Sequence, residues 1–378
     1  MSSKNIVYFV TDVTSANIFG YAQILALSEQ GYKVYLICNS NKLSKELQQL
    51  VYSSTYINTL KREISLISDI KSFINLLFIL TKLRPALIIY STPKAAFFGS
   101  IVSSIIGTKI RIYQIWGIRW QNFSGIKLWV VRSADFLAIH LSTKVTIVSK
   151  SVLEFFNSNY KFSNLIVLGS GSTTGVDSRI FYPSKSLRVP GQGHKIGYAG
   201  RVSNDKGISD LFDLFARLST QISDLDLEII GDLDLEDKIS EKLILDLKSN
   251  PRIKWINSLS QPALAERMRD WDLQIFLSKR EGLGNVILEA GACGVPTFCW
   301  DIIGIKDAIP DFAQDFLISY GEMKLLEKSV SNYLYSPLEE SKKLKLAQWY
   351  LDHFEQKKVL SEFVGFINNN FKAYHDSK

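Results

Sequence analysis

The sequence predicts an α/β protein built from two doubly wound parallel-sheet domains. This prediction rests on the length, on the composition and on short β-rich apolar runs that alternate with helical stretches. A chain of 378 residues suggests two or three domains at roughly 150 residues per domain. Its 46% hydrophobic residues can fill ordinary globular cores, which argues against disorder and against a repeat fibre.

The first half of the chain shows this alternation clearly. Continuous apolar runs at 6–10 and 34–38 flank a helical stretch that ends at Gly31. Further short apolar runs, each separated from the next by a helical segment, lie at 86–90, 110–115 and 145–148. Such a pattern is typical of a parallel sheet with crossover helices, and it predicts a first domain over 1–172.

A connecting segment and a second domain follow. Between about 169 and 195 the alternation stops and Gly, Ser, Thr and Pro dominate, which predicts an interdomain linker over 173–194. Beyond it we expect a second α/β domain over 195–350. Its predicted strands lie at 196–199, 227–230, 253–256, 273–277 and 296–299. Helical periodicity near the end predicts a C-terminal helix over 351–378 that could cross back to the first domain.

The charge is divided unevenly along the chain. The whole chain carries a formal charge of +7, but residues 1–150 hold 17 Lys and Arg against six Asp and Glu, a balance of +11 that leaves −4 for the remainder. A basic half suits an anionic surface such as an acidic membrane leaflet, and a solvated basic surface without a partner is the alternative. Only 21% of the residues are charged, so we expect no nucleic-acid partner.

The three cysteines, Cys38, Cys293 and Cys299, are too few and too scattered for a disulfide framework or a zinc cluster, which favours a reducing compartment. No stretch approaches the roughly 18 apolar residues of a membrane span, and the short apolar run after Lys4 does not suffice for the core of a signal peptide. We therefore expect a cytoplasmic protein that is peripheral on the inner face of the plasma membrane.

One segment, 64–83, has the length of a helix and is a candidate for membrane contact. It contains an all-apolar run at 76–80. The basic residues in or beside it are Lys61, Arg62, Lys71, Lys82 and Arg84. An interfacial amphipathic helix has this composition. A helix packed against its own sheet has it too, and this second interpretation is favoured.

The segment EGLGNVILE at 281–289 holds the strongest chemical signal. A helix that starts near Asn285, a good N-cap residue, would make Gly282 and Gly284 a tight loop. The backbone N–H groups of such a loop and the helix dipole attract an anion. Glu281 would lie at the mouth of the loop. Glu289 would lie about one turn into the helix, where it could face the cleft at the carboxyl ends of the strands.

Two carboxylates beside an anion site suit a ligand that also carries hydroxyl groups. A sugar would present hydroxyls to Glu281 and a ribose would present them to Glu289, so the arrangement suggests a nucleotide sugar. The alternative is that Glu289 is a surface residue favoured by the helix dipole and that Glu281 is a solvated loop charge.

A second loop, GRVSNDKG at 200–207, follows the predicted strand at 196–199 and opens into a helical segment. Its two cations, Arg201 and Lys206, lie five residues apart. A guanidinium offers a planar bidentate fork and an ammonium a mobile point charge, and together they can bind a diphosphate. Taken alone, two such cations on a loop are more often solvated.

In this order, the two loops resemble motifs of the retaining glycosyltransferases of family 4, which have the GT-B fold. GYAGRVSNDKG is similar to the family's G-R-x4-K-G diphosphate loop, and EGLGNVILE is similar to its E-x7-E motif. TGVDSRIF resembles its N-G-V-D-x3-F segment, with Thr174 in place of Asn. KREI at 61–64, STPKA at 91–95 and GIKDAI at 304–309 resemble stretches of a bacterial surface-polysaccharide branch.

The resemblance implies a fold and a donor site. The fold would consist of two Rossmann-like domains that face each other across a cleft. Arg201 and Lys206 would bind the donor diphosphate and stabilise it as it leaves. Glu281 would contact the donor sugar and Glu289 the ribose. Further donor contacts would come from Gly200, from the loop residues Gly282, Leu283, Gly284, Asn285 and Val286, and from Trp255 and Ser258 near the base. Family members need no metal and no cofactor beyond the donor.

The implied reaction transfers a hexose or an N-acetylhexosamine from a nucleotide-diphosphate sugar, with UDP as the expected nucleotide, and retains the anomeric configuration. The acceptor would be a polyprenyl-diphosphate-linked saccharide at the anionic inner leaflet, in the synthesis of capsule, O-antigen or a related glycan. Residues expected on the acceptor side are Asn17, Lys94, Trp116 and Arg119. The chain departs from the family in this half, because Trp116 stands where many relatives carry His and because 11–17 lacks the usual glycine pair.

Two other functions fit parts of the sequence. A nucleotide-sugar epimerase of the same fold would use the same donor contacts without an acceptor. A non-catalytic sugar- or membrane-binding protein would bind without turnover. The glycine spacing G-x-G-x3-G at 169–175, followed by a predicted linker, argues against NAD. We assign no chemistry to the four histidines, because none has a metal or triad partner at a useful spacing.

Overall fold

The computed structural model describes residues 4–61, 63–121, 123–183, 193–235, 237 and 239–376. It divides into two compact units, the first made of Met1–Thr174 with Lys357–Lys378 and the second of Gly175–Gln356. Each unit contains one parallel sheet, so the predicted α/β class with two doubly wound sheets is confirmed. Three parts of the sequence predictions lie outside the described residues: Arg62, 184–192 of the expected linker and 377–378 of the expected C-terminal helix.

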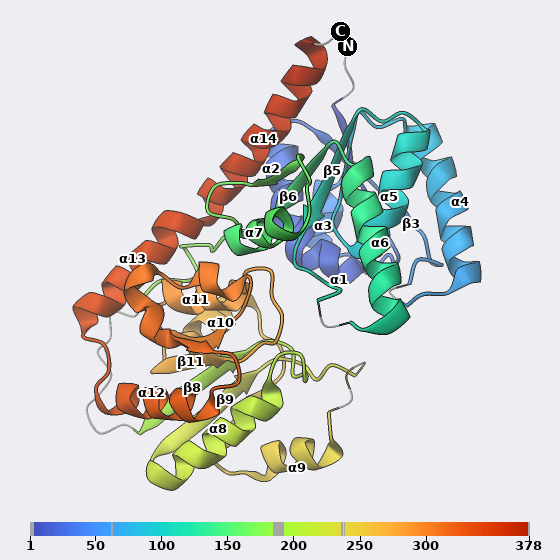
Figure 1. Ribbon diagram of the computed structural model, residues 1–378. Coiled ribbons are helices and arrows are strands. Elements are labelled where there is room, and N and C mark those ends of the chain that lie inside the picture. The colour runs from blue at the N-terminus through green and yellow to red at the C-terminus, as the bar shows by residue number, and fades with distance from the viewer. Residues whose placement is uncertain are drawn as a thin grey trace. The chain divides into compact units, whose positions relative to one another are not determined.

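The first unit contains a seven-stranded sheet in the order β3-β2-β1-β4-β5-β6-β7 (Figure 1). Its strands are β1 Asn5–Phe9, β2 Lys33–Cys38, β3 Ser53–Tyr56, β4 Leu87–Tyr90, β5 Ile110–Ile115, β6 Lys144–Ile147 and β7 Leu165–Val167. The five strands predicted from apolar runs are confirmed. The sequence did not reveal β3 and β7, because β3 is polar and β7 is very short.

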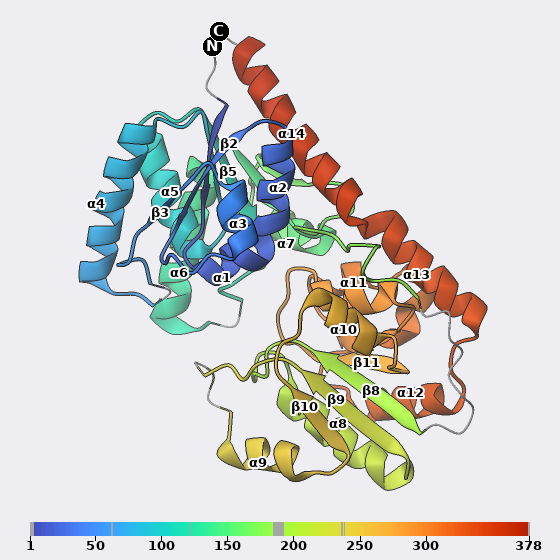
Figure 2. The same ribbon diagram turned by 180° about the vertical axis from the view of Figure 1, so that it is seen from behind.

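Helices cover this sheet. The helical segments of the unit are α1 Val13–Ser15, the π-helical turn η1 Ala16–Gly20, α2 Tyr21–Glu29, α3 Lys45–Leu50, α4 Leu66–Leu83, α5 Pro93–Ile105, α6 Gly125–Leu141, α7 Lys150–Asn159 and α14 Gln356–Asp376. In Figures 1 and 2, α4, α5 and α6 lie side by side, with α5 packed against both neighbours. Within the described residues, no helix combines the length and the apolar character needed to cross a membrane.

The C-terminal helix α14 completes the core of the first unit. Its side chains Phe363, Val364, Ile367 and Phe371 pack in one cluster with the core residues of β1, β2 and β4. The helix that we expected over 351–378 therefore joins the first unit from residue 357 onward. It begins later than expected because the preceding residues form a separate helix, α13, in the second unit.

The second unit contains a six-stranded sheet in the order β10-β9-β8-β11-β12-β13, of which β8, β9 and β10 are seen side by side in Figure 2. Its strands are β8 His194–Ala199, β9 Leu225–Ile230, β10 Ile253–Ile256, β11 Leu273–Phe276, β12 Thr297–Asp301 and β13 Leu317–Ser319. The five strands predicted in this half are confirmed, and the short edge strand β13 was not predicted.

The helices of the second unit are packed closely against their neighbours. They are α8 Ile208–Gln221, α9 Glu241–Ser249, α10 Gln261–Met268, α11 Asn285–Ala292, α12 Met323–Tyr335 and α13 Glu340–Phe354, with the 3-10 turns η2 Ile305–Ala308 and η3 Asp311–Phe316.

Glu228 of β9 is buried, where it pairs with Arg267 and accepts a hydrogen bond from Trp271 Nε1 at 3.0 Å. Burial opposes its ionisation, but these partners outweigh burial and lower the pKa of Glu228.

Part of the expected linker is packed into the second unit. The N–H group of Val176 donates to the carbonyl oxygen of Phe354 at 2.8 Å, and Phe181 is buried. Asp177 accepts a hydrogen bond from the N–H group of Arg179 at 2.9 Å, which closes a turn between the two buried residues. The expectation of a linker therefore fails at 175–181, where the TGVDSRIF segment serves packing.

Candidate functional site

Both predicted loops leave the same edge of the second sheet. β8 and β11 are neighbours in this sheet, with β9 beyond β8 and β12 beyond β11. The chain connections therefore diverge between β8 and β11, and open α/β sheets bind ligands at such a point outside the carboxyl ends of the strands. Loop 200–207 leads from β8 to α8, and loop 277–284 leads from β11 to α11.

The backbones of the two loops are in contact. Gly207 has φ +74°, and a Cβ atom built on it would lie 2.1 Å from the carbonyl oxygen of Leu277. Glycine is therefore required at this position. The N–H group of Lys279 donates to the carbonyl oxygen of Asp205 at 2.8 Å. These contacts fix Lys206 beside the end of β11.

The side chains of Lys206 and Glu281 form an ion pair, with Nζ 2.5 Å from Oε1. Only 17% of the lysine side chain and 14% of the glutamate side chain are exposed, so water has little access to the pair. An ammonium group has three N–H donors and a carboxylate has two oxygens. One ligand can therefore accept a hydrogen bond from Lys206 and donate one to Glu281 while the two residues stay paired.

Arg201 lies on the more open side of the same loop. Its side chain is 54% exposed, and its guanidinium pairs with Asp234 and lies 3.7 Å from Asp205. Arg280 approaches Asp205 from the other loop, at 3.8 Å. Burial opposes ionisation of Asp205, but the Ser203 hydroxyl and the surrounding cations outweigh burial and lower its pKa. An ionised Asp205 therefore holds cations from both loops at this edge.

Helix α11 begins at Asn285, as predicted, but its N-cap is a different residue. Gly284, with φ +83°, is the N-cap, and Asn285 is the first helical residue. The prediction of Asn285 as N-cap is wrong because the chain turns through a left-handed residue, which favours glycine over asparagine. Gly304 packs against the same loop, since a Cβ atom on it would lie 2.6 Å from the carbonyl oxygen of Glu281. The segment GIKDAI therefore supports the loop.

The loop and the first turn of α11 present amide groups without partners. Within the part of the chain that the structure describes, the backbone N–H groups of 282–286 donate no hydrogen bond. They belong to Gly282, Leu283, Gly284, Asn285 and Val286. Unpaired amides at a helix N-terminus attract an anion through hydrogen bonds and through the helix dipole. The cations of loop 200–207 and these amides thus flank the same switch point.

Glu289 lies one turn into α11 in surroundings that disfavour charge. Burial raises the pKa of its carboxyl group to about 8. Among the described residues, its side chain has no hydrogen-bond or ion-pair partner. A ligand that donates hydrogen bonds to the carboxylate would stabilise its charged form. The group is therefore suited to hydroxyls such as those of a ribose.

Trp255 and Ser258 lie at the carboxyl end of β10, beyond β9 on the same edge. Trp255 Nε1 donates to the carbonyl oxygen of Gly231 at 2.9 Å, and the N–H group of Ser258 donates to Asp232 Oδ1 at 3.1 Å. These hydrogen bonds attach the end of β10 to the loop that follows β9. Both residues therefore help to shape this edge of the second sheet.

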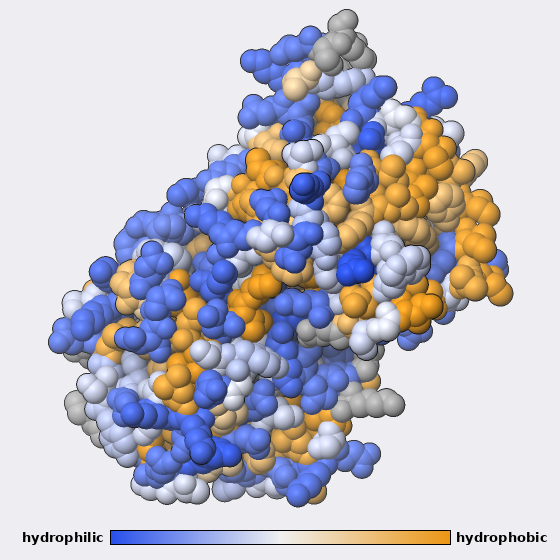
Figure 3. Space-filling model, in the orientation of Figure 1, coloured by the Kyte–Doolittle hydropathy of each residue, from blue (hydrophilic) through white to orange (hydrophobic). Residues whose placement is uncertain are grey.

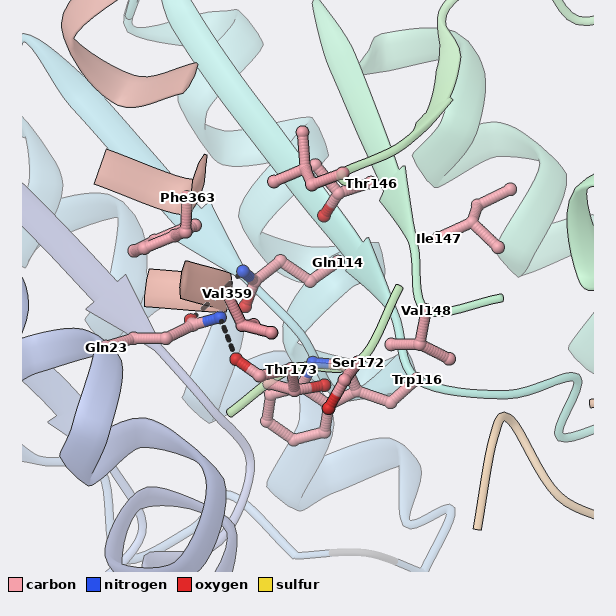
Figure 4. Close-up of a pocket in the computed structure, with 11 residues that line it drawn as sticks. Gln23, Gln114, Trp116, Thr146, Ile147, Val148, Ser172, Thr173, Val359 and Phe363 are labelled. Atoms are coloured by element: carbon pink, nitrogen blue, oxygen red, sulfur yellow. Dashed lines mark hydrogen bonds between the residues drawn. The ribbon is translucent and has the colours of Figure 1, made fainter. Parts of the chain in front are cut away.

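The first unit has a small pocket, lined by both polar and apolar side chains, at the carboxyl ends of β5 and β6 (Figure 4). Gln114 Nε2 donates to Gln23 Oε1 at 3.0 Å, and Gln23 Nε2 donates to the carbonyl oxygen of Thr173 at 3.1 Å. Trp116 also lines the pocket, and its ring centroid lies 4.9 Å from that of Phe19. Its buried indole N–H group has no acceptor among the described residues.

The other residues expected on the acceptor side have different surroundings. Asn17 binds two backbone groups of the segment before α3, at 3.0 and 3.2 Å. Lys94 pairs with Asp69 at 2.7 Å, and only 12% of its side chain is exposed. Arg119 is exposed on the loop after β5. Asn17 and Lys94 therefore make contacts that hold the first unit together.

Three residues of the second edge were not predicted: Asp205, Asp234 and Arg280. Asp205 and Arg280 directly precede Lys206 and Glu281 in the sequence, and this adjacency is the signal that could have revealed them. Asp234 comes from the loop after β9, which matches no motif. Only the structure shows that it pairs with Arg201.

Comparisons with known proteins agree with this geometry. Residues 183–347 match the family model described as glycosyl transferases group 1. Over 342 residues, the chain is 29% identical to the capsular polysaccharide biosynthesis glycosyltransferase CapM of Staphylococcus aureus, covering 88% of each protein. A D-inositol 3-phosphate glycosyltransferase of Pseudarthrobacter chlorophenolicus is 30% identical over 145 residues, 36% of this chain and 34% of that protein.

Solved structures share the fold over nearly the whole chain. A sucrose-phosphate synthase from Thermosynechococcus elongatus superposes with a TM-score of 0.78 at 15% identity, covering 98% of this chain and 100% of that chain. HepE from Anabaena, in complex with UDP and glucose, superposes with a TM-score of 0.74 at 19% identity, covering 96% and 99%. The resemblance to family 4 is therefore confirmed: the chain has the GT-B fold, and residues 183–347 are similar to the group 1 glycosyl transferases.

Proposed function

We propose that the protein transfers a hexose or an N-acetylhexosamine from a UDP-sugar to a lipid-linked saccharide and retains the anomeric configuration. The observation that carries this proposal is the Lys206–Glu281 pair at the switch point of the second sheet, with an Nζ to Oε1 distance of 2.5 Å. It offers a cation for a diphosphate and a carboxylate for sugar hydroxyls. HepE, which shares the fold, was crystallised with UDP and glucose, and this supports UDP as the nucleotide.

In the proposed reaction, negative charge develops on the β-phosphate as its bond to the anomeric carbon breaks. Lys206 and the amide groups of 282–286 stabilise that charge. Arg201 leaves Asp234 and binds the same diphosphate, because a half-exposed ion pair is weak enough to exchange its partner. Glu289 accepts hydrogen bonds from the ribose, and Trp255 and Ser258 lie near the base.

Retention follows in this proposal from attack on the face that the diphosphate leaves. The departing phosphate oxygen takes the proton of the acceptor hydroxyl, while Glu281 holds the hydroxyls of the donor sugar. Lys206 and Arg201 supply positive charge and the amides supply hydrogen bonds, and we propose that no metal ion is needed. Within the described ranges, no three His, Cys, Asp or Glu side chains are placed to hold a metal ion.

We place the acceptor at the carboxyl edge of the first sheet. The pocket beside Trp116 offers a buried N–H donor and neutral amides, which suit saccharide hydroxyls. The similarity to CapM, over 88% of both proteins, favours a surface polysaccharide such as capsule or O-antigen as the product. Assembly of such a glycan on a polyprenyl diphosphate would take place at the inner face of the plasma membrane.

A panel of nucleotide sugars tests the proposal. One UDP-sugar should raise the melting temperature of the protein and be slowly hydrolysed without acceptor. With a polyprenyl-diphosphate saccharide, NMR of the product should show the anomeric configuration of the donor. An inverted product would exclude retention. An isomerised nucleotide sugar in the acceptor-free incubation would identify an epimerase, and binding without any turnover would identify a binding protein.

A further inference from the structure

The outer face of α4 is apolar and exposed. The helix buries Ser72, Leu76 and Leu80 against the first unit. Five large apolar side chains are nevertheless exposed by 57% to 78%: Leu66, Ile67, Ile70, Ile74 and Phe78. Most of them recur at intervals of three or four residues and so form one stripe along the helix. Packing against the unit therefore explains one apolar face of α4 and leaves the other unexplained.

Helix α6 adds to this surface. Its first turns expose Ile126 by 82% and Trp129 by 63%. Since α5 packs against both α4 and α6, the three helices form one layer. Figure 3 shows hydrophobic residues gathered over the part of the first unit where Figure 1 places these helices. We call the five α4 residues together with Ile126 and Trp129 the apolar ridge. Exposed apolar patches of this kind mark interaction sites.

The exposed charge of the two helices is positive. Lys71 and Lys82 on α4 and Lys127 on α6 are exposed. The acidic side chains of the same helices are withdrawn from the surface, because Asp69 pairs with Lys94 at 2.7 Å and Asp135 is buried. A surface that combines apolar side chains with lysines complements an anionic lipid bilayer.

The apolar ridge begins at the edge of the sheet where we place the acceptor. Lys94, in the first turn of α5 directly after β4, binds Asp69 in the first turn of α4. Helix α6 begins after the loop that carries Trp116 from the end of β5. The N-terminal turns of α4 and α6 therefore both lie at the carboxyl edge of the first sheet.

We propose that the apolar ridge inserts into the interfacial layer of an anionic membrane, with Lys71, Lys82 and Lys127 among the headgroups. The proposal rests on the proposed function for its role, because a lipid-linked acceptor has to reach the first unit from the bilayer. Salt screens the attraction between lysines and headgroups, but it does not screen the burial of apolar side chains. Binding therefore has a component that persists at high salt.

A second copy of the chain is the alternative partner that could cover the apolar ridge. A symmetric dimer through the apolar ridge would bring the same lysines of both copies together at a partly dehydrated interface. Their repulsion would oppose such a dimer. The positive charge beside the apolar ridge therefore favours anionic lipid over self-association.

Co-sedimentation of the full chain with vesicles tests the proposal. The protein should bind vesicles of phosphatidylcholine mixed with phosphatidylglycerol, and part of the binding should persist at about 0.5 M salt. The variant Ile67→Ser/Phe78→Ser should bind about tenfold more weakly or worse at either salt concentration. The control Leu235→Ser/Leu245→Ser removes two apolar side chains of the second unit that are 90% and 65% exposed, and it should bind like the unmodified protein.

Trp129 gives a second measurement that reports on insertion itself. Brominated lipid chains should quench tryptophan fluorescence in the bound protein, and Trp129→Phe should lose part of that quenching. This substitution keeps a large apolar side chain at an exposed position, so the fold should be retained. Equal quenching in both proteins would contradict insertion of the apolar ridge.

The outcomes separate this proposal from the proposed function. Equal vesicle binding by the unmodified protein and Ile67→Ser/Phe78→Ser would overturn the apolar ridge, as would a dimer that this variant dissociates without a change in vesicle binding. Donor hydrolysis without acceptor should be the same in both proteins. If neither hydrolyses any donor while vesicle binding depends on the apolar ridge, the proposed function fails and the membrane surface stands.

Discussion

The carboxyl edges of the two sheets share a topology and differ in chemistry. In the first sheet β1 lies between β2 and β4, and in the second sheet β8 lies between β9 and β11, so each edge has the same switch point. At the first, the hydroxyl oxygens of Thr11 and Thr92 lie 2.6 Å apart. At the second, Lys206 Nζ lies 2.5 Å from Glu281 Oε1. The pair of side chains that spans the first switch point is neutral, and the pair that spans the second is charged.

This difference separates what the strand order decides from what the loops decide. Packing of helices on a parallel sheet fixes the switch point, but the residues after each strand fix the ligand. A diphosphate requires cations and amides, which the second edge supplies. Saccharide hydroxyls can be bound by neutral groups such as the buried amides of Gln23 and Gln114. The excess of Lys and Arg over Asp and Glu in residues 1–150 can therefore serve outer surfaces such as the one around the apolar ridge.

Removing the cation that distinguishes the second edge should have the largest effect. Lys206→Ala should lower kcat by about a hundred- to a thousandfold, because loss of one donor to a developing charge costs roughly 2.7–4 kcal/mol. Steady-state kinetics with the donor found in the panel measures this. Arg217→Ala is the matched control, since Arg217 lies on α8 away from the loops, is 53% exposed and lies 3.8 Å from Glu327 of α12. Near-normal turnover of Lys206→Ala would show that the second edge does not need this cation for catalysis.

The central strands of both sheets could be predicted because strands buried on both faces are continuous apolar runs. The edge strands β3, β7 and β13 lack this signal, being short, half-exposed or polar. The linker prediction failed at 175–181 for a related reason. Composition shows the turn residues there, but it cannot show the hydrogen bond between Val176 and the distant Phe354.

Those parts of the candidate site that depend on strand order and motif spacing could be predicted. Parallel strands end at the same edge, so loops after β8 and β11 were expected to meet, and Lys206 and Glu281 do so across 75 residues. The pairing of Arg201 with Asp234 was not predictable, because it depends on a loop with no motif. The dehydration of Glu289 was not predictable either, because it depends on how segments distant in sequence pack around the side chain.

Glu289 provides the next test, because its buried carboxyl group belongs to the proposed donor site at the second edge. Its pKa is about 8 in the folded protein against an ordinary value of 4.5, so between these pH values the folded state binds a proton that the unfolded state has released. The free energy of unfolding should therefore fall as pH rises through this window, by up to about 1.4 kcal/mol per pH unit from this group.

Glu289→Gln should remove that contribution, so urea unfolding at pH 5 and pH 8.5 should show a smaller loss of stability in the variant. The same substitution should raise the KM for the donor, since a neutral amide binds ribose hydroxyls less strongly than a carboxylate. Parallel pH profiles of stability would show that the carboxyl group is not dehydrated. An unchanged KM would contradict the ribose contact.

The smallest effect is expected at the first edge, from Trp116→Phe. The substitution leaves an aromatic ring beside Phe19 and removes an N–H group without an acceptor among the described residues, so the fold should not lose stability. If this N–H group binds an acceptor hydroxyl, the acceptor KM should rise about fivefold, as expected for one hydrogen bond of about 1 kcal/mol. Donor hydrolysis without acceptor should not change.

Trp271→Phe in the second unit is the matched control for this substitution. Its N–H group donates to the buried carboxylate of Glu228 at 3.0 Å, so its loss should destabilise the protein by about 1–3 kcal/mol and leave the acceptor KM unchanged. The two substitutions thus have opposite expected effects. Trp116→Phe should weaken acceptor binding without loss of stability, and Trp271→Phe should lower stability without a change in acceptor binding. If Trp116→Phe changes the donor KM instead, the assignment of the donor to the second edge and of the acceptor to the first edge is wrong.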